Sequence, residues 1–540
     1  RFGDDGALLL PARSALSFAL ELPAGSFLAW DEIAAEGDAR LEIGVRGERA
    51  AERTERPTAA GRLRLTGDES ALVELTLRAL GAGGALRVAG ARLHRPAEVS
   101  APSSPAPPLA ERPNLIVYLI DTLRADHLGC YGYDRPTSPA IDAFAREAVR
   151  FQVARAQAPW TKPAVATLLT GVYPPTHGAD FRSRGLSPEV ETLAERLADA
   201  GYETAFFTTN PTVTAAFGFD RGFSTYRYLT EPAGKGRKRK HVDSATIHRE
   251  VVAWLERRDT TRPFFLVVHT LDPHDPYRPP ERFRARFAPD VDAEVACCVR
   301  AHELAALAPD AARERAREMA ALYDAEIAEN DESFGALVAE LSRRDLLASS
   351  AVVLTSDHGE EFYDHGGWRH AMTLYEEVLR VPLLLRLPGR ALAGRVVAAP
   401  ADQIDLAPTL LELAGVAAPP ELPGTSWLAA LAGGEAPDPE SLSWLEHPSF
   451  ALAGVVRGAL KGIRNSGGWR PPLERGPFEL YDLARDPLEG NDLAIERPLA
   501  RHWLFGRLAA AEARLGRTHA APEVEIDPEL ERSLRALGYF

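Results

Sequence analysis

The sequence contains little cysteine, and none of its hydrophobic runs is long. Its three cysteines, Cys130, Cys297 and Cys298, form no disulfide framework and therefore do not indicate a redox compartment. No apolar run reaches the 18 or more residues that a transmembrane helix needs. Acidic residues outnumber basic ones: the chain has 77 Asp and Glu and 62 Lys and Arg, which gives a net charge of −15. This balance argues against a nucleic-acid partner or an anionic membrane surface.

The rest of the composition is that of a large soluble protein. Hydrophobic residues make up 45% of the 540 positions and charged residues 26%, which is ordinary for a globular chain. The length predicts two to four domains, or one large α/β domain with attachments. The chain begins at Arg1 rather than Met, which is compatible with removal of a signal peptide or an anchor.

The pattern of apolar and polar residues changes along the chain and predicts four structural parts. Residues 1–98 contain short runs with period-two alternation, such as RLEIGV and ALVELTLRAL, which predict an accessory β-sandwich of the jelly-roll kind. Residues 99–113 are rich in Pro, Ala and Ser and are typical of a linker. We expect a catalytic α/β domain over 114–440 and a small α+β subdomain over 441–540.

Residues 114–440 alternate between buried strands and helices. The apolar runs NLIVYLI, TAFFTT, FFLVVHT, AVVLTS and VPLLLRL are typical of strands buried on both faces. Helical spacing between them, as in 139–149 and 190–201, predicts a mixed, mostly parallel sheet flanked by helices. We expect long, charged, solvent-facing helices over 311–347 and a solvated basic loop at 235–241, KGRKRKH.

Acidic and histidine residues follow three of these strands. Asp121 comes after NLIVYLI, His274 lies in the DPHDP turn after FFLVVHT, and Asp357 and His358 follow AVVLTS. Each of them alone also fits an ordinary turn or cap. Open parallel sheets carry their sites at the carboxyl ends of the strands, so the coincidence predicts a site for a divalent cation. Carboxylates and imidazole suit Zn, Mn or Mg, and carboxylates also suit Ca.

The stretch APWTKPAVATLLTG (158–171) adds a candidate nucleophile. Pro163 lies in the first turn of a predicted helix that closes at Gly171, so Thr161 stands near the N-cap. An ordinary capping role fits this position. The same helix end also favours an anion, and a hydroxyl there beside a cation can attack a phosphate or sulfate ester.

Five motifs in order resemble the sulfatase family of the alkaline-phosphatase superfamily, and the resemblance runs from about residue 112 to the C-terminus. RPNLIVYLIDTLRADHLGCYGYDRPTSPAIDAFAREAVRF (112–151) resembles its opening strand and metal loop, and APWTKPAVATLLTGVYPPTHG (158–178) its nucleophile helix. HTLDPHDPYRPP (269–280) resembles the central His segment. The stretches at 356–389 and 478–494 resemble the second metal loop and the C-terminal motif.

This resemblance implies roles for individual residues. It implies one divalent metal, Mn, Zn, Ca or Mg, and a metal-dependent hydrolase of anionic esters derived from a glycan or a lipid. It also implies a periplasmic or extracellular location. The implied residues are metal-binding Asp121, Thr161, Asp357 and His358, catalytic Thr161, His274 and His370, and substrate-binding Lys162, Asn210 and His365.

The departures from the family pattern indicate altered chemistry. Sulfatases carry Cys or Ser at the nucleophile position, followed by x-Pro-Ser-Arg, and oxidise it to formylglycine. Here the stretch is Thr161-Lys162-Pro163-Ala164-Val165, so no formylglycine is expected. Thr122 replaces the second Asp of the opening motif, which shifts the site from Ca toward Mn or Zn. We therefore expect a preference for phosphodiesters or phosphonate monoesters.

Three alternatives stay open at this point. The first is a phosphoglycerol or phosphoethanolamine transferase, and the second is an inactive, glycan-binding sulfatase homologue. The third has two metals, with Asp272, His274 and either His370 or His447 forming a second site. The sequence does not identify the substrate or the oligomeric state. Residues 281–345 are expected to form a helical insertion that shapes specificity.

Overall fold

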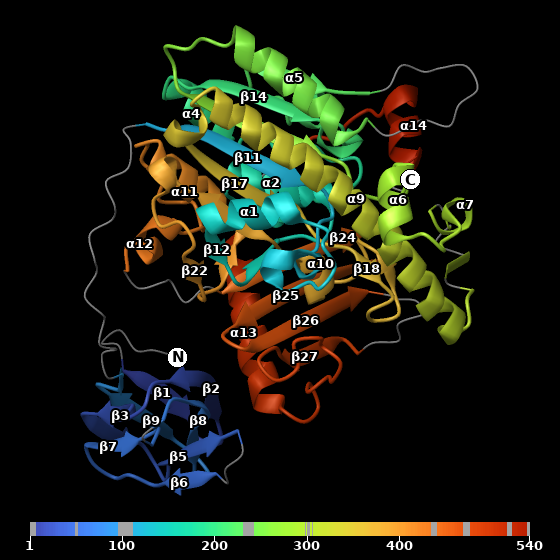
Figure 1. The fold of residues 1–540 in the computed structure, drawn as a ribbon. Helices are drawn as coiled ribbons and strands as arrows, with labels where there is room; N and C mark the ends of the chain where they lie inside the picture. Colours follow the sequence, from blue (N-terminus) through green and yellow to red (C-terminus); the bar gives the residue numbers. More distant parts are fainter. Residues whose placement is uncertain are drawn as a thin grey trace. The chain divides into compact units, whose positions relative to one another are not determined.

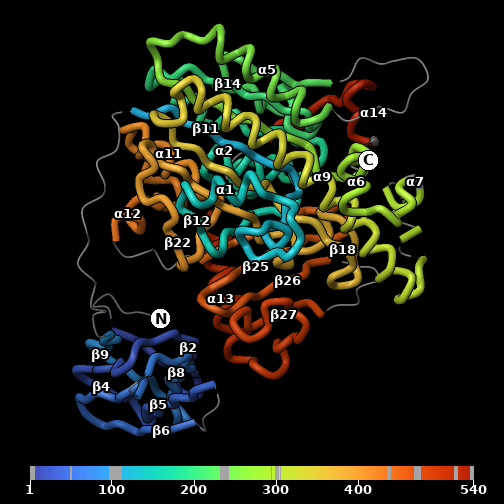
Figure 2. The backbone as a smooth tube through the Cα atoms, viewed as in Figure 1, coloured from blue at the N-terminus to red at the C-terminus, as the bar shows by residue number. Residues whose placement is uncertain are grey.

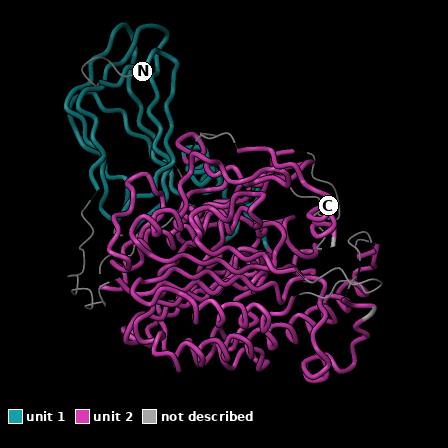
Figure 3. The backbone as a smooth tube through the Cα atoms, turned by 90° about the horizontal axis from the view of Figure 1, so that it is seen from above, with its two compact units in different colours: residues 1–100, 478–481, 491–510 teal, residues 101–477, 482–490, 511–540 magenta. Residues whose placement is uncertain are grey.

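The chain divides into two compact units (Figure 3). One comprises residues 1–100, 478–481 and 491–510, and the other comprises residues 101–477, 482–490 and 511–540. The computed structural model describes residues 7–48, 52–67, 69–95, 112–230, 242–297, 299, 303–304, 306–433, 440–467, 476–515 and 521–536. The predicted linker, apart from Arg112 and Pro113, and the basic loop 235–241 lie outside the described residues. The boundaries at 98, 113 and 440 stay predictions.

Antiparallel sheets form the N-terminal part of the first unit, as expected. Their strand orders are β1-β9-β4, β10-β3-β7 and β2-β8-β5-β6. The strands are β1 (Leu8–Pro11), β2 (Ala15–Leu22), β3 (Phe27–Trp30), β4 (Glu32–Ala35), β5 (Arg40–Gly47), β6 (Arg53–Glu55), β7 (Gly61–Arg64), β8 (Ala71–Leu80), β9 (Ala85–Ala89) and β10 (Arg92–His94). Alternate residues of β8, including Val73, Leu75 and Leu77, point into one core.

An eight-stranded sheet organises the second unit (Figure 1), in the order β15-β14-β16-β11-β17-β21-β12-β22. Its strands are β11 (Asn114–Ile120), β12 (Val149–Phe151), β14 (Glu203–Thr208), β15 (Thr225–Tyr228), β16 (Phe264–Thr270), β17 (Ser350–Ser356), β21 (Leu383–Arg386) and β22 (Val396–Val397). The five strands from β15 to β17 in this order run parallel, and β21 is antiparallel to β17. The predicted mixed, mostly parallel sheet is therefore confirmed.

Helices cover both faces of this sheet. On one face, α1 (Pro139–Glu147), α5 (Ser244–Arg257) and α9 (Pro309–Arg343) pack together over alternate strand residues such as Ile116 and Tyr118. On the other face lie α2 (Thr161–Thr170), α4 (Leu193–Asp199) and α11 (Leu406–Leu413). The tube view follows the same layers (Figure 2). Burial on both faces explains why the strands read as continuous apolar runs.

Shorter elements complete the described chain. They are β13 (Ala154–Arg155), β18 (Glu361–Phe362), β19 (Trp368–Arg369), β20 (Arg380–Val381), β23 (Ala401–Asp402), β24 (Ser441–His447), β25 (Phe450–Arg457), β26 (Leu460–Gly467), β27 (Phe478–Asp482), α3 (Pro174–His177), α6 (Glu281–Phe287), α7 (Ala293–Ala296), α10 (Glu376–Leu379), α12 (Trp427–Leu431), α13 (Pro498–Leu515) and α14 (Pro528–Ala536). β24, β25 and β26 pair in antiparallel fashion.

The helix α9 corrects the prediction of solvent-facing helices over 311–347. It is one long helix, and one side of it is buried against α1, α5 and α6. Its buried polar residues have partners: Asp331 accepts the N–H groups of Ala140 and Ile141 at the start of α1, and Asp324 accepts from the hydroxyl of Tyr133. The charged composition misled the sequence interpretation because these carboxylates are buried with hydrogen-bond donors.

Candidate active site

The carboxyl ends of four neighbouring strands meet at one edge of the large sheet. Asp121 directly follows β11 and Asp357 directly follows β17. Asn210 lies two residues after β14, and His269 is the penultimate residue of β16. Because β14, β16, β11 and β17 are adjacent and their ends are aligned, these four side chains belong to the same edge, where open parallel sheets bind ligands.

Two carboxylates and one imidazole form a compact cluster at this edge. One ligand atom from each of Asp121, Asp357 and His358 lies within 4.8 Å of the others, and all three residues are buried. The His358 Nε2 atom lies 3.3 Å from Asp357 Oδ2. Its Nδ1 atom lies 2.8 Å from the Gly359 carbonyl oxygen, to which it donates, so Nε2 presents its lone pair to the cluster.

Unpartnered polar atoms surround this cluster. Among the described residues, Asp121 Oδ1, Thr122 Oγ1, His269 Nε2 and Asp357 Oδ2 are buried without a hydrogen-bond partner. A buried polar atom without a partner costs roughly 1–3 kcal/mol, so four of them together need an explanation. Two carboxylate oxygens and an imidazole nitrogen suit a divalent cation. The residues therefore fit a metal ion held by Asp121, Asp357 and His358.

The titration behaviour of the cluster agrees with this fit. Burial and the neighbouring Asp357 raise the pKa of Asp121 well above its ordinary value. Burial lowers the pKa of His358 to about 4, in spite of Asp357, and lowers that of His269 to about 4. Both imidazoles are thus neutral at pH 7, which is the form that binds a metal, while the paired carboxyl groups favour a cation between them.

Thr161 is the first residue of α2, and Trp160 occupies the N-cap position. The cap position of this helix thus lies one residue before Thr161, which itself belongs to the first turn. The Thr161 Oγ1 atom lies 3.3 Å from His358 Nε2 and 3.5 Å from Asn210 Nδ2. The helix end therefore presents a buried hydroxyl to the carboxylate–imidazole cluster.

Asn210 joins this hydroxyl to the cluster. Its amide nitrogen donates to Asp121 Oδ2 at 2.6 Å and faces Thr161 Oγ1. Its carbonyl oxygen accepts from both the backbone N–H and the hydroxyl of Thr212, which fixes the orientation of the amide. Predicted as a substrate-binding residue, Asn210 lies where it holds the positions of Asp121 and Thr161.

His274 and His370 lie beside the cluster, as expected from the motifs. Their ring centroids are 5.0 Å apart, and the rings of His358 and His370 are 4.5 Å apart. His370 Nδ1 lies 2.9 Å from Glu360 Oε1, and the hydroxyl of Tyr277 donates to the other oxygen of that carboxylate. Burial lowers the pKa of His370, but Glu360 and the cluster carboxylates outweigh it and raise this pKa. An imidazolium here suits an anion.

The backbone around His370 is strained. Arg369 has φ 68° and Ala371 has φ 63°, the left-handed region that non-glycine residues rarely adopt. Such residues cost on the order of 1–3 kcal/mol each and persist where the surroundings fix them. The N–H of Ala371 donates to the Pro159 carbonyl at 2.9 Å. This contact ties the His370 loop to the chain entering α2.

A cavity of about 180 Å³ opens beside His274 and His370. Aromatic and apolar side chains dominate its wall, and several cationic groups join them. The lining residues are Trp160, Phe181, Arg182, His274, Asp275, Trp368, Arg369, His370, Ala371, Met372, Leu445, Glu446, His447 and Pro448. A cavity of this kind fits a ring-containing molecule that carries an anionic group.

Lys162 lies behind this cavity rather than in it. Its Nζ atom donates to the Arg182 carbonyl oxygen at 2.7 Å and lies 4.1 Å from the centroid of the Phe217 ring. The side chain is almost fully buried, and burial lowers the pKa of Lys162 to about 7. Lys162 thus supports Arg182 in the cavity wall, and its substrate-binding role stays a prediction.

The buried Lys162 predicts a pH-dependent stability. The folded protein favours neutral Lys162 and the unfolded chain favours the charged form, so stability is lost as the pH falls from about 10.5 toward 7. Relative to a Lys162→Met variant, the wild-type free energy of unfolding should therefore rise by up to about 1.4 kcal/mol per pH unit in this window. Denaturant unfolding at several pH values measures it, and parallel curves for both proteins contradict it.

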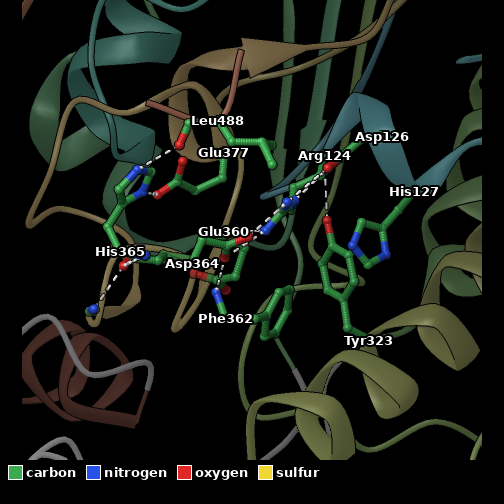
Figure 4. Close-up of polar contacts among 12 residues, drawn as sticks. Arg124, Asp126, His127, Tyr323, Glu360, Phe362, Asp364, His365, Glu377 and Leu488 are labelled. Carbon is green, nitrogen blue, oxygen red and sulfur yellow. Dashed lines mark hydrogen bonds and ion pairs between the residues drawn. The ribbon is translucent and has the colours of Figure 1, made fainter. Parts of the chain in front are cut away.

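His365 does not join the site. Its Nδ1 atom lies 2.7 Å from Glu377 Oε1, and its Nε2 atom lies 3.0 Å from the Leu488 carbonyl oxygen (Figure 4). Its ring stacks on Tyr375. Glu361, His365 and Glu377 form a second carboxylate–imidazole group. Both ring nitrogens of His365 face oxygen atoms of the protein, which favours a structural role, and its substrate-binding role stays a prediction.

A buried arginine connects the two loops of the site (Figure 4). Arg124, three residues after Asp121, donates to the Glu360 carbonyl oxygen at 3.0 Å and pairs with Asp364 in the hairpin of β18 and β19. The Tyr323 hydroxyl of α9 accepts the backbone N–H of Arg124 at 2.8 Å. The loop after β11 is thereby fixed to the hairpin that precedes His370.

The residues of the two-metal alternative do not gather into one group. Asp272 Oδ2 accepts the N–H and the hydroxyl of Ser244, and the His447 ring stacks on Phe450. Within the described part of the chain, no carboxylate–imidazole group joins Asp272 to His274, His370 or His447. The geometry favours one metal.

Sequence reasoning missed several residues of this site. His269 is a polar residue inside an otherwise apolar strand, and Glu360 follows directly after the Asp357-His358-Gly359 turn. Both signals are visible in the sequence. Asp275 and Arg369 carry no such signal, because only the fold brings them to the same cavity.

The sequence model of the sulfatase family matches residues 113–416, and that of the N-sulphoglucosamine sulphohydrolase C-terminal region matches residues 364–501. The chain is 26% identical over 415 residues to an ulvan-active sulfatase of Formosa agariphila, covering 71% of this chain and 77% of the relative. It is 25% identical over 435 residues to a choline-sulfatase of Rhizobium meliloti, covering 71% and 82%.

Solved structures share the fold. A phosphonate monoester hydrolase of Agrobacterium radiobacter superposes with a TM-score of 0.60 at 23% identity, over 77% of this chain and 99% of that one. The phosphonate monoester hydrolase of Silicibacter pomeroyi gives 0.59 at 21% identity, over 75% and 96%. The chain thus has the α/β fold of the alkaline-phosphatase superfamily. It belongs to the sulfatase family and is an ester hydrolase of that family.

None of the helices in the described part of the chain combines the length and the apolar character that crossing a bilayer requires.

Proposed function

We propose that the protein is a metal-dependent hydrolase that uses Thr161 as its nucleophile and prefers phosphodiesters or phosphonate monoesters to sulfate esters. One observation carries the proposal: the Thr161 hydroxyl lies at the start of α2, 3.3 Å from His358 Nε2 and 3.5 Å from Asn210 Nδ2. A hydroxyl buried among metal-ligand side chains at a helix N-terminus is suited to attack an anionic ester.

The chemistry of threonine supports phosphorus over sulfur. Formylglycine carries an aldehyde, and one oxygen of its hydrate attacks sulfur as the alcohol leaves. The second hydroxyl of the hydrate then expels sulfate by cleavage of the C–O bond, so no water has to attack sulfur. Oxidised threonine would be a ketone, and the arginine of the sulfatase pattern is replaced by the buried Val165. A threonine hydroxyl attached to phosphorus forms an ordinary phosphoester, which water can cleave in a second step.

The roles of the side chains follow from their positions. A divalent cation bound by Asp121, Asp357 and His358 would lower the pKa of the attacking hydroxyl and offset the charge of the ester. Thr161 gives its hydroxyl proton to water, and its Oγ1 atom forms the new bond to phosphorus as the ester oxygen leaves. His274 gives the leaving oxygen a proton. His370, charged and held by Glu360, binds a non-bridging oxygen. Asn210 keeps Thr161 and Asp121 in place.

The test compares kcat/KM of the metal-loaded protein on matched 4-nitrophenyl esters: a sulfate, a phosphate monoester, a phosphate diester and a phosphonate monoester. We expect kcat/KM for the phosphate diester and the phosphonate monoester to exceed that for the sulfate ester by at least tenfold, or about 1.4 kcal/mol. A preference for sulfate would overturn the account of the nucleophile while leaving the family assignment intact.

A further inference from the structure

Two unsatisfied polar groups lie side by side in the cavity next to the candidate catalytic histidines. Asp275 is 6% exposed, and its Oδ1 atom has no hydrogen-bond partner in the described structure. Arg369 Nη2 lies 3.2 Å from the other oxygen of this carboxylate and donates to the Val299 carbonyl at 2.7 Å. Arg369 Nε is also buried without a partner. The pair thus presents one open acceptor and one open donor.

These two groups are close to the bond that would be cleaved. Asp275 directly follows His274, whose Nδ1 atom lies 2.5 Å from the Asp275 carbonyl oxygen. Arg369 directly precedes His370, and both pairs line the same cavity. A group bound by Asp275 and Arg369 would therefore belong to the part of the substrate next to the ester oxygen.

The groups around Asp275 do not fully compensate its carboxylate for the loss of water on burial. Burial raises the pKa of its carboxyl group to about 6, although Arg369 and His370 both lower it; Glu360 adds to the increase. A buried carboxylate is normally satisfied by several donors. In Asp275 only the Oδ2 atom has a donor, which is Arg369. The left-handed φ of Arg369 adds to the cost of the arrangement. Unsatisfied groups of this kind are typical of a site completed by a ligand.

We propose that Asp275 and Arg369 determine substrate specificity by binding a hydroxyl group that neighbours the cleaved ester on the alcohol side of the substrate. A hydroxyl group donates and accepts a hydrogen bond through one oxygen atom, so it can serve both of these neighbouring groups at once. It would donate to Asp275 Oδ1 and accept from Arg369 Nε. The aromatic wall, with Trp160, Phe181 and Trp368, fits a ring carrying that hydroxyl. The substrate class is therefore an anionic ester of a cyclic polyol. This inference rests on the ester-cleaving site proposed above, but not on the choice between sulfur and phosphorus.

The test uses two alcohols that differ by one hydroxyl. The kcat/KM values for the methylphosphonate monoesters of trans-cyclohexane-1,2-diol and of cyclohexanol are measured, and the rate of each ester without enzyme is subtracted. If the sulfate esters are the better substrates, the same two alcohols are compared as sulfates, so that failure of the proposed phosphorus preference is read separately. The wild-type enzyme should prefer the diol ester by about 10- to 100-fold.

Variants assign this preference to the pair. In Asp275→Ala the ratio of the two kcat/KM values should fall to within about threefold of one. Arg369→Lys keeps the positive charge but removes the Nε donor, and should lower the ratio by about tenfold. Glu446→Ala removes another acidic group of the same cavity and should leave the ratio unchanged. Because both esters are measured on one sample, partial unfolding of a variant does not move the ratio. A wild-type ratio near one, or an unchanged ratio in Asp275→Ala, would overturn the proposal.

Discussion

A Thr161→Val enzyme is expected to fold normally and to lose at least about 10³-fold in kcat/KM toward its best ester. Valine has nearly the shape of threonine, and the N-cap residue of α2, Trp160, is unchanged. The substitution puts a methyl group in place of the hydroxyl that lies beside His358 and Asn210. Steady-state kinetics measures the loss, and circular dichroism and Tm establish that the fold persists.

The matched control for this change is Thr161→Ser. It keeps a hydroxyl at the start of α2 and lacks the downstream arginine of the formylglycine pattern, so it should retain activity within about 100-fold of the wild type. Near-normal turnover in Thr161→Val would remove Thr161 from the mechanism. Equal, severe losses in both variants would point to the methyl group, and hence to packing rather than nucleophilic attack.

An Asp357→Asn variant is expected to bind its divalent cation at least about 100-fold more weakly and to lose activity in parallel. Asparagine can still accept the N–H of Thr122, which Asp357 Oδ1 accepts at 3.0 Å. The variant therefore keeps the local backbone and loses the negative charge between Asp121 and His358. Removal of the cation from the wild-type enzyme with a chelator should produce the same loss of activity, and adding Mn or Zn should restore it.

Metal content and stability measure this outcome independently of turnover. At a cation concentration near 1,000 times Kd, binding should stabilise the wild type by about 4 kcal/mol, and Asp357→Asn should show little of this increase. Asp272→Asn is the control, because Asp272 faces Ser244 instead of the cluster. A metal-to-protein ratio near one agrees with a single site. A ratio near two that falls in Asp272→Asn would establish the second site.

The sequence was sufficient for the sheet and for most of the candidate site. Strands buried on both faces leave long apolar runs, and the turn residues that follow them mark the carboxyl edge, which located Asp121, Asp357 and His358. The fold of the family is confirmed by its matching models and structures. The roles of these residues, the domain boundaries and the cellular location stay predictions.

The residues that the structure places elsewhere than the motifs suggest have identifiable physical causes for their positions. His365 lies close in sequence to His370, but a hairpin turns it toward Glu377 and Leu488, and motif spacing does not encode that rotation. Lys162 follows Thr161 in a helix, so its side chain points about 100° away around the helix axis. The pairing of Asp275 with Arg369 depends on two loops meeting, which no local pattern predicts.

The edge formed by β14, β16, β11 and β17 has a consequence for how the chain folds. Thr122 and Asp357, which are joined by a hydrogen bond, are 235 residues apart in the chain, and Asn210 and His269 lie between them. No short fragment contains the cation-binding set, so tight binding appears only after the central strands have paired. Cation uptake during refolding would then report completion of the sheet. A partly folded chain would not yet be stabilised by the bound cation, so it would be the form most exposed to proteolysis.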